Sequence, residues 1–298
     1  MRILIAGGTG LIGRALCRYW IGQGHEILVW SRSPGKVAAL CSGARGIARL
    51  SEAEDGIPVE AVVNLAGAPI ADRPWTRSRR ALLWRSRIDL TRELIDWMSR
   101  QTGKPKVLIS GSAVGWYGDC GDELIDESSP RGHSDFGSEL CEAWEKEAAR
   151  AIPLGIRVAI VRTAVVLSSQ GGMLPRLTFS FKLKSAVRFG KGTQWMPWIH
   201  IDDQVRLIDF LLRKEECSGV YIAAAPGQIN HAALVEVLSG IFKSRLLLVL
   251  PEWFIRLSMG EVSTLLLSSQ RVQPAHALAE GFEFTYPEMK AALSDLLR

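Results

Sequence analysis

The sequence lacks the marks of several large classes of protein. Its five cysteines are widely spaced and include no C-x-x-C pair, which argues against a zinc site or a disulfide framework and for reduced thiols. No apolar run approaches the length of a membrane span, and no signal peptide precedes the first predicted strand. We therefore expect a cytoplasmic protein with no metal site and no membrane partner.

Charge of one sign is not in large excess either. The 298 residues include 36 basic and 31 acidic side chains, a net charge of +5, and no basic stripe is interleaved with aromatic residues. This pattern does not suit a nucleic-acid partner. A hydrophobic content of 47% and a charged content of 22% are typical of a globular protein, and the length suits one large domain or two unequal ones.

The chain does contain a strand, turn, helix and strand pattern at its start. An apolar run over Arg2–Ala6 leads into GGTGLIG (7–13), an amphipathic stretch to about Gln23 and a second apolar run over Glu26–Trp30. This order is typical of the first βαβ unit of a dinucleotide-binding sheet. The turn residues predicted to bind the cofactor are Gly7, Thr9, Gly10, Leu11, Ile12 and Gly13.

The glycines of this turn have separate physical roles. Gly7 permits backbone angles that a Cβ atom would forbid. Gly10 lets the main chain approach a pyrophosphate, and Gly13 lets the helix press onto the sheet. The free N–H groups at the start of the helix favour a phosphate.

An acidic residue is missing at the end of the second strand, where an NAD-binding unit usually has one to bond the ribose hydroxyls. Ser31 and Arg32 stand there instead. An arginine suits a 2′-phosphate by its charge and its fork of donors. We therefore predict NADP(H), with Ser31 and Arg32 in its site. The other interpretation is an ordinary solvated arginine at a strand end.

Two further strands point to the same edge of the sheet. The run Glu60–Leu65 is followed by small residues, which predicts that Leu65, Ala66 and Gly67 line the cofactor, although a plain tight turn is the alternative. Ser112 follows the predicted strand Lys106–Ile109 and so lies where a ligand would bind. Other predicted elements are a long helix over Arg73–Arg100, a helix over Asp203–Lys214 capped by Asp202, and a short strand within Gly281–Tyr286.

Arginines crowd the first half of the predicted helix Arg73–Arg100. Two interpretations stay open: some of them face an anionic cofactor or substrate, or they form a solvated face or a subunit interface. The arginines are Arg73, Arg77, Arg79, Arg80, Arg85 and Arg87.

Several later motifs follow the glycine turn in order. The motifs are ISGSAVGWYGD (109–119), RTAVVLSSQGGML (162–174), PWIHIDD (197–203), LSSQRVQP (267–274) and GFEFTYPEMKAAL (281–293). Over essentially the whole chain, the sequence resembles the extended and atypical short-chain dehydrogenase/reductases, the nucleotide-sugar epimerase superfamily, and most closely the YfcH-like epimerase family.

The resemblance implies a fold and a cofactor. It implies an α/β fold, a Rossmann doubly wound parallel sheet over residues 1–220, which binds NADP(H). It also implies a smaller C-terminal substrate-side domain over residues 221–298, which shares the cleft with residues 168–200. Related enzymes often pair through two long helices, here about 75–100 and 138–151, so a homodimer is expected by analogy.

The chain departs from the superfamily at its catalytic pair. Active members carry Tyr-x-x-x-Lys, in which the tyrosinate is the acid/base and the lysine lowers its pKa; Phe136 and Leu140 stand at those positions. The remaining catalytic candidates are Ser112, as a residue that orients a carbonyl, and Tyr117, as a general acid. For each of the two, the other interpretation is a side chain that only packs in the protein interior.

Two functions follow from these residues. The first is an NADP(H)-dependent oxidoreductase or epimerase-like enzyme that acts on an unknown small-molecule carbonyl or nucleotide-sugar substrate. The second is a catalytically silent NADP(H)-binding redox sensor or partner-binding module, which the loss of the Tyr-x-x-x-Lys pair favours.

Overall fold

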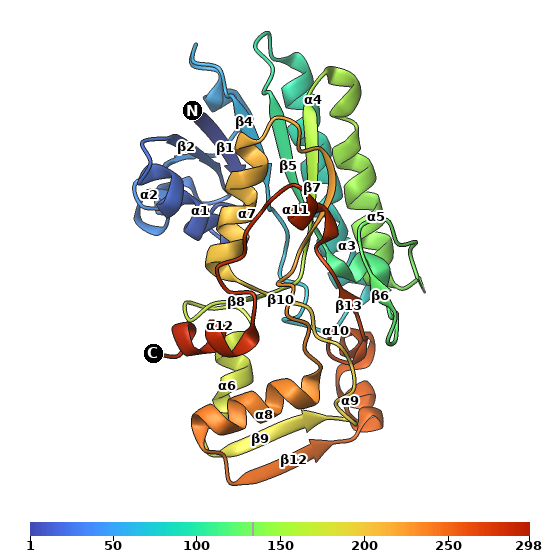
Figure 1. Ribbon diagram of the computed structural model, residues 1–298. Helices are drawn as coiled ribbons and strands as arrows, with labels where there is room; N and C mark the ends of the chain where they lie inside the picture. The colour runs from blue at the N-terminus through green and yellow to red at the C-terminus, as the bar shows by residue number, and fades with distance from the viewer. Residues whose placement is uncertain (133) are drawn as a thin grey trace.

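The centre of the protein is a seven-stranded parallel sheet, seen in a computed structural model that describes residues 1–132 and 134–298 (Figure 1). The strand order is β11-β7-β5-β4-β1-β2-β3, so the chain winds outward in both directions from β1 and β4. This order confirms the predicted α/β, doubly wound fold class. The strands are β1 (Arg2–Ala6), β2 (Glu26–Trp30), β3 (Arg45–Ile47), β4 (Ala61–Asn64), β5 (Val107–Ala113), β7 (Arg157–Thr163) and β11 (Gly219–Ala223).

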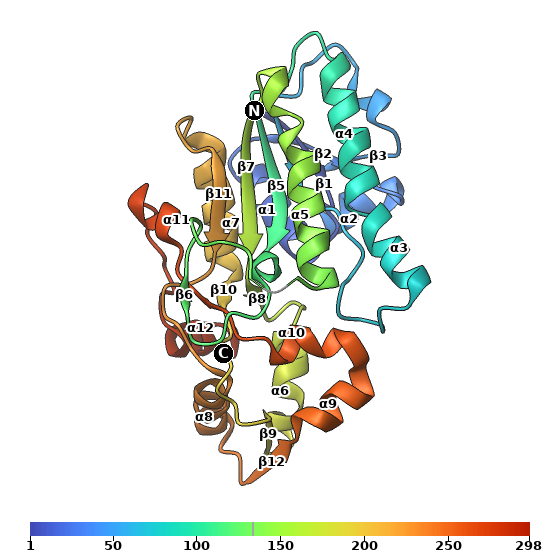
Figure 2. The ribbon, with the colours of Figure 1, turned by 90° about the vertical axis from the view of Figure 1, so that its right-hand side faces the viewer.

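Helices cover both faces of this sheet (Figures 1 and 2). On β1, Ile3 and Ile5 pack into one apolar core and Leu4 packs into a second, because side chains alternate along a strand. The first core includes α1 (Leu11–Ile21) and α7 (Ile201–Arg213), and the second includes α4 (Ile88–Arg100) and α5 (Phe136–Ala149).

A second, smaller lobe lies below the sheet in Figure 1. Its two parallel strands, β9 (Ser185–Phe189) and β12 (Leu246–Leu250), pack with α6 (Leu174–Lys182) and α8 (His231–Phe242), and α9 (Glu252–Met259) follows β12. We call residues 174–192 and 231–262 the β9–β12 lobe. The predicted division into residues 1–220 and 221–298 stays a prediction.

The remaining helices and strands are short or connect the two lobes. They are α2 (Val37–Leu40), α3 (Arg77–Arg85), α10 (Thr264–Leu267), α11 (Ala275–Ala279), α12 (Met289–Leu296), β6 (Leu124–Ile125), β8 (Val165–Leu167), β10 (Trp198–His200), β13 (Arg271–Val272) and the short 3-10 helices η1 (Pro34–Lys36), η2 (Leu50–Ala53), η3 (Val114–Tyr117), η4 (Ile152–Leu154) and η5 (Gly260–Ser263).

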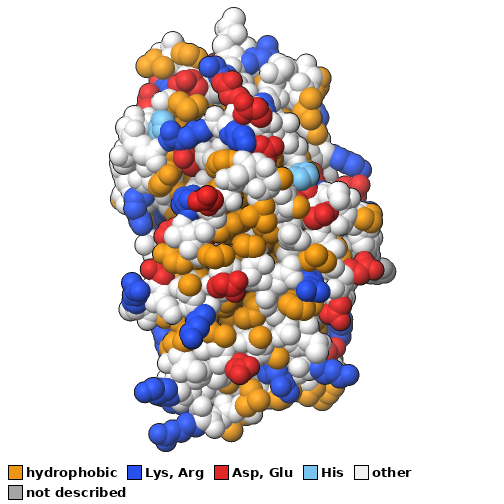
Figure 3. Space-filling view, viewed as in Figure 1, with side chains coloured by type: hydrophobic (Ala, Val, Ile, Leu, Met, Phe, Trp, Pro, Cys, Tyr) orange, Lys and Arg blue, Asp and Glu red, His pale blue; other side chains and the backbone are white. Residues whose placement is uncertain are grey.

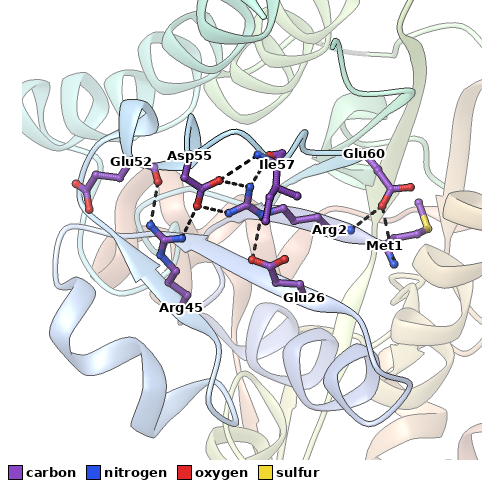
Figure 4. Close-up of polar contacts among 8 residues, drawn as sticks. All are labelled: Met1, Arg2, Glu26, Arg45, Glu52, Asp55, Ile57 and Glu60. Carbon is purple, nitrogen blue, oxygen red and sulfur yellow. Dashed lines mark hydrogen bonds and ion pairs between the residues drawn. The ribbon is translucent and has the colours of Figure 1, made fainter. Parts of the chain in front are cut away.

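An arginine network fixes the amino end of the sheet, opposite the glycine turn (Figure 4). The buried guanidinium of Arg2 donates to Glu26 at 3.0 Å and to the carboxylate of Asp55 at 2.5 and 2.6 Å. Arg45 donates to the same carboxylate at 2.6 Å. The Arg2 and Arg45 hydrogen bonds hold the pKa of Asp55 well below its usual range. This network ties β1, β2 and β3 to the segment before β4.

The predicted long helix over Arg73–Arg100 is wrong, because two helices, α3 and α4, occupy this stretch. The hydroxyl of Ser86 donates to the carbonyl of Leu83 and accepts the N–H of Ala68 at 3.0 Å. A serine that bonds the backbone in this way competes with helix continuation. The break sets Arg87 between the helices, with its side chain turned toward the segment after β4.

Three smaller predictions are also wrong. His200, not Asp202, caps α7, since its ring nitrogen accepts the N–H of Asp202 at 3.1 Å. No strand forms within residues 281–286, because the N–H groups of Thr285 and Tyr286 bond the buried carboxylate of Asp203 at 2.8 Å each. Ser112 lies inside β5 rather than beyond it, because β5 pairs with β7 as far as Ala113.

Candidate functional site

The glycine turn is pressed against the segment that follows β4. Gly7 has a φ of +84°, and a Cβ atom there would lie 2.7 Å from the carbonyl of Leu65. A Cβ atom at Gly13 would lie 2.4 Å from the carbonyl oxygen of Gly7. Both positions therefore exclude any larger residue. The turn after β1 and residues 65–67 after β4 meet at the carboxyl edge of the sheet, where Ala6 pairs with Asn64.

The start of α1 has no side-chain cap, a feature that it shares with α4 and α6. Its N-cap, Gly10, provides no side-chain hydrogen bond, and the first turn holds no acidic residue. Helices α3, α5, α7 and α8 each begin with a side chain that accepts a backbone N–H. The free N–H groups and partial positive charge at the start of α1 suit a phosphate. The predicted cofactor residues Thr9, Leu11 and Ile12 lie at this helix start.

Arg32 is an exposed arginine at the same edge. Trp30, the last residue of β2, pairs with Ala6 of β1, and Ser31 and Arg32 follow directly. The Ser31 hydroxyl accepts the N–H of Ser33 at 3.1 Å. Within residues 1–132 and 134–298, no carboxylate pairs with Arg32. Its charge is free to meet a ligand.

The structure singles out Arg87 among the crowded arginines. Its guanidinium donates to the carbonyls of Ala68 and Leu83, and its carbon lies 2.7 Å from where a Cβ atom of Gly67 would be. It also lies 5.3 Å from the centre of the Trp144 ring. Burial lowers the pKa of Arg87, and no carboxylate pairs with it in the described part of the chain. A cation thus stands beside the predicted cofactor segment.

A hydrogen-bond relay fixes the surroundings of Arg87. The hydroxyl of Thr91 accepts from Asn64 at 2.7 Å and from the Trp144 indole at 3.0 Å, and it donates to the carbonyl of Arg87. Asn64 and Thr91 are fully buried. The relay joins the end of β4, the start of α4 and the middle of α5, and so it sets the position of the Arg87 backbone.

Apolar packing surrounds Phe136 and Leu140, the two positions at which the resemblance places the Tyr-x-x-x-Lys pair. Phe136 lies edge-on to Trp75, with ring centres 5.2 Å apart, and the Arg80 guanidinium lies 4.8 Å above the Phe136 ring. Leu140 is 1% exposed and belongs to the same cluster as Trp75 and Trp144. Neither position provides a group that titrates. A mechanism that needs tyrosinate and ammonium at these two positions is excluded.

Ser112 takes part in a buried ionic network. Its hydroxyl donates to Glu145 at 2.6 Å, and Arg162 donates to the same carboxylate twice, at 2.9 Å each. Burial alone lowers the pKa of Arg162, but the hydrogen bonds and charge of Glu145 outweigh it and raise that pKa. The Ser112 proton is thus directed at Glu145, and the role of this serine toward a carbonyl stays a prediction.

Tyr117 is buried and its hydroxyl is hydrogen-bonded within the protein, and its role as a general acid stays a prediction. The side chain is fully buried, its hydroxyl donates to the carbonyl of Asp126 at 2.8 Å, and it accepts from Arg162 at 2.9 Å. Burial raises the pKa of Tyr117 to about 12.

The sequence analysis did not predict the buried pair of Glu145 and Arg162. The available signal was an acidic residue at an inward position of α5 and a basic residue in a buried strand.

A cavity of about 350 Å³ adjoins this edge. Ala71, from the segment after β4, lines the cavity together with Leu265 and Leu266, and most of the other lining residues belong to the β9–β12 lobe. Met173 also lines it and directly follows Gly172, whose missing Cβ atom would lie 3.0 Å from Leu11 of the glycine turn. The cavity is therefore connected to the cofactor edge through one short loop.

Two features are absent from residues 1–132 and 134–298. No helix there is both long and apolar enough to cross a membrane. No group of three or more His, Cys, Asp or Glu side chains there is placed to hold a metal ion.

The fold and the glycine turn define an α/β protein of the Rossmann type. Residues 3–224 match the NAD dependent epimerase/dehydratase family, and residues 250–296 match a domain of unknown function, DUF1731. The chain belongs to the NAD dependent epimerase/dehydratase family. This result confirms the resemblance drawn from the motifs.

Relatives match over the full length. Epimerase family protein YfhF from Bacillus subtilis is 32% identical, over 100% of this chain and 98% of that protein. Epimerase family protein SDR39U1 from Homo sapiens is 32% identical over 100% of both. A crystal structure of human SDR39U1 (isoform 2) with NADPH superposes with a TM-score of 0.88, at 30% identity over 99% of both chains. DesIV, a dTDP-glucose 4,6-dehydratase from Streptomyces venezuelae, shares the fold with a TM-score of 0.79 at 16% identity over 100% of this chain and 96% of that one.

Proposed function

We propose that this protein is an NADP(H)-dependent oxidoreductase of the epimerase family, which acts on a small carbonyl or nucleotide-sugar substrate without the Tyr-x-x-x-Lys pair. The observation that carries the proposal is the carboxyl edge of the sheet. There, the uncapped start of α1, the Gly7–Leu65 contact and the unpaired Arg32 provide a phosphate site and a free cation. The human relative crystallised with NADPH supports this choice of cofactor.

The chain's own residues would bind and orient the cofactor. Arg32 would meet the 2′-phosphate, the turn from Gly7 to Gly13 the pyrophosphate, and Leu65 to Gly67 the ribose side, with Arg87 adding positive charge behind Gly67. When bound, NADPH would supply a hydride to a carbonyl carbon, and the carbonyl oxygen would take its proton from solvent water. The apolar cluster of Phe136 and Leu140 would keep water from one side of the site, and Ser112 is the predicted catalytic hydroxyl near the end of β5.

A catalytically silent redox sensor is the second candidate, favoured by Phe136 and Leu140. A Phe136→Tyr substitution restores the phenol alone, since Leu140 is fully packed and a lysine there would bury a charge. Gain of carbonyl reduction in this variant, with an inactive wild type, would support the silent candidate. For that candidate, saturating NADPH must also change the oligomeric state in light scattering or the capture of a partner in a pulldown.

A substrate panel tests the enzyme. Purified protein with NADPH is offered aldehydes, ketones and nucleotide-sugars, and product formation is followed by loss of NADPH absorbance and by mass spectrometry. A reduced or epimerised product supports the proposal. If NADPH binds and no panel member reacts, the enzyme proposal is contradicted.

The proposal also covers the cellular compartment and the oligomeric state of the protein. All five cysteines are free thiols, which supports a reducing compartment such as the cytoplasm. A homodimer through the α4 and α5 face stays an analogy with related enzymes, and the molar mass in solution tests it.

A further inference from the structure

The cavity beside the cofactor edge is apolar almost all round. Of the 17 residues that line it, only Arg176, Ser180 and His231 are polar. The walls come from α6, β9, α8 and the segment 259–266, and include Leu177, Phe181, Leu234 and Leu266. Its volume of about 350 Å³ falls within the usual range of small-molecule sites, roughly 300–1,000 Å³. A sugar would lose hydrogen bonds to water here without replacement.

Two of the three polar side chains, His231 and Arg176, differ in burial and in charge. His231 is buried and stacks on Phe189 with ring centres 4.7 Å apart. Burial, and then the charge of Arg188, lower the pKa of His231 to about 4, so the ring is neutral at neutral pH. Arg176 is exposed, and among the described residues no carboxylate pairs with it. The cavity thus joins apolar walls to one free cation on α6.

We propose that this cavity binds an apolar molecule that carries one anionic group, with the apolar part against α8 and β9 and the anion at Arg176. The inference rests on the proposed function, and it names the substrate class of that site. Gly171 and Gly172 lie beside Leu11 and the next residue, Met173, lines the cavity, so one loop borders both the cavity and the predicted cofactor edge.

Calorimetric titration with laurate below its micelle concentration tests this site. Lauryl alcohol is the uncharged comparator, and UDP-glucose is the polar one. We expect laurate to bind best and UDP-glucose not to bind. Arg176→Gln should weaken laurate binding about tenfold and leave lauryl alcohol unchanged, whereas Lys182→Gln, an exposed change on the same helix, should change neither.

A second variant separates loss of the site from loss of the fold. Leu177→Trp adds volume inside the cavity and should abolish laurate binding while NADPH binding stays intact. UDP-glucose binding without laurate binding would overturn the inference, and so would an Arg176→Gln variant with unchanged laurate affinity. If NADPH fails to bind and laurate binds, the proposed cofactor is wrong and the cavity inference stands.

A separate observation concerns the outer surface of the β9–β12 lobe. Ten of the 19 large exposed hydrophobic side chains found in the described part of the chain lie in this lobe, which is about a sixth of the sequence. The four residues Leu246 to Val249 of β12 are each 45–52% exposed, and Trp253 and Leu257 of α9 are 66% and 77% exposed. Strand β12 forms the outer edge of the lobe (Figures 1 and 2).

The same lobe holds the net charge of the protein. It has eight basic and three acidic residues, a net charge of +5, while the rest of the chain has 28 of each sign. In Figure 3, several blue side chains lie at both sides of the lower end of the molecule, with smaller orange areas among them. The basic residues are Arg176, Lys182, Lys184, Arg188, Lys191, Lys243, Arg245 and Arg256.

We infer that this lobe docks on an anionic lipid bilayer, with β12 and α9 inserted at the headgroup level and the lysines and arginines against acidic headgroups. An exposed apolar surface with a basic rim is what interfacial binding requires. A second copy of this chain fits less well, since two lobes of charge +5 would repel. This inference departs from the sequence-based expectation of no membrane partner, and it involves no spanning helix.

Vesicle co-sedimentation tests the docking surface. We expect binding to phosphatidylcholine vesicles that contain phosphatidylglycerol, little binding to pure phosphatidylcholine, and loss of binding as salt rises. Lys243→Glu with Arg245→Glu should lower the bound fraction at least roughly tenfold, as should Trp253→Ser with Leu257→Ser. The matched control, Arg77→Glu with Arg85→Glu on α3, should keep binding. No binding to acidic vesicles, or a wild-type dimer that Trp253→Ser makes monomeric, would overturn the inference.

Discussion

Arg162 on β7 donates two hydrogen bonds of 2.9 Å to the carboxylate of Glu145 on α5, and both side chains are almost completely buried. Ser112 and Tyr117 both bond to this pair. The two residues that the sequence offered as catalytic candidates therefore belong to one structural network.

Breaking this pair should destabilise the fold strongly. Arg162→Met leaves a buried carboxylate without its partner, so the free energy of unfolding in urea should fall by about 3–5 kcal/mol. Lys146→Gln on the same helix removes an exposed pair with Glu142 and should change stability by less than about 1 kcal/mol. Equal effects of the two variants would contradict the structural role assigned to Arg162.

The glycine turn should not tolerate a methyl group. Gly13→Ala forces a Cβ atom against the carbonyl of Gly7, so α1 must shift away from the phosphate site. We expect at least a tenfold loss of NADPH affinity in a fluorescence titration, whereas Gly35→Ala, where a Cβ atom meets open space, should bind normally. An unchanged affinity in Gly13→Ala would place the phosphates elsewhere.

Replacing Arg87 should weaken the binding of NADPH and of NADH to the same extent. It stands behind Gly67, away from the strand end where Arg32 lies, so Arg87→Gln should weaken NADPH and NADH by a similar factor, about tenfold. Arg85→Gln, an exposed neighbour on α3, is the control and should bind both as the wild type does. A change in the ratio of the two affinities would show that Arg87 reads the 2′-phosphate instead.

His231 should make the stability depend on pH. The pKa of His231 is about 4 in the folded protein and about 6.5 in the unfolded chain. As pH falls, the unfolded state therefore becomes protonated at a higher pH than the folded state. The stabilisation is present above about pH 6.5 and is lost as pH falls toward 4, by up to about 3 kcal/mol. Urea unfolding of His231→Phe should show a flatter profile over this window, while the exposed His276→Gln should follow the wild type.

The sequence predicted the local features well. The turn from Gly7 to Gly13 is encoded in adjacent residues, and its strand, turn and helix are determined by short-range sterics. Arg32 could be placed because it follows a strand whose end is fixed by the same unit.

The features that could not be predicted depend on contacts between residues that are far apart in the sequence. The sequence offered Phe136 and Leu140 at the expected positions of the catalytic pair, but it did not show that Trp75 and Trp144 pack in the same cluster. Tyr117 looked available because nothing near it in the sequence shows the Arg162 side chain that binds its hydroxyl. The exposed edge strand β12 was not predicted, since a run of five apolar residues ordinarily indicates a buried strand.

Titration of the purified protein with NADPH and NADH, side by side for the wild type and Arg32→Gln, tests the central claim most directly. We expect tight NADPH and weak NADH binding to the wild type, and a loss of about tenfold or more in NADPH affinity in Arg32→Gln, with NADH unchanged. Equal binding of the two cofactors by the wild type would make Arg32 an ordinary surface charge. Binding of neither would contradict the cofactor site itself, and the oxidoreductase proposal with it.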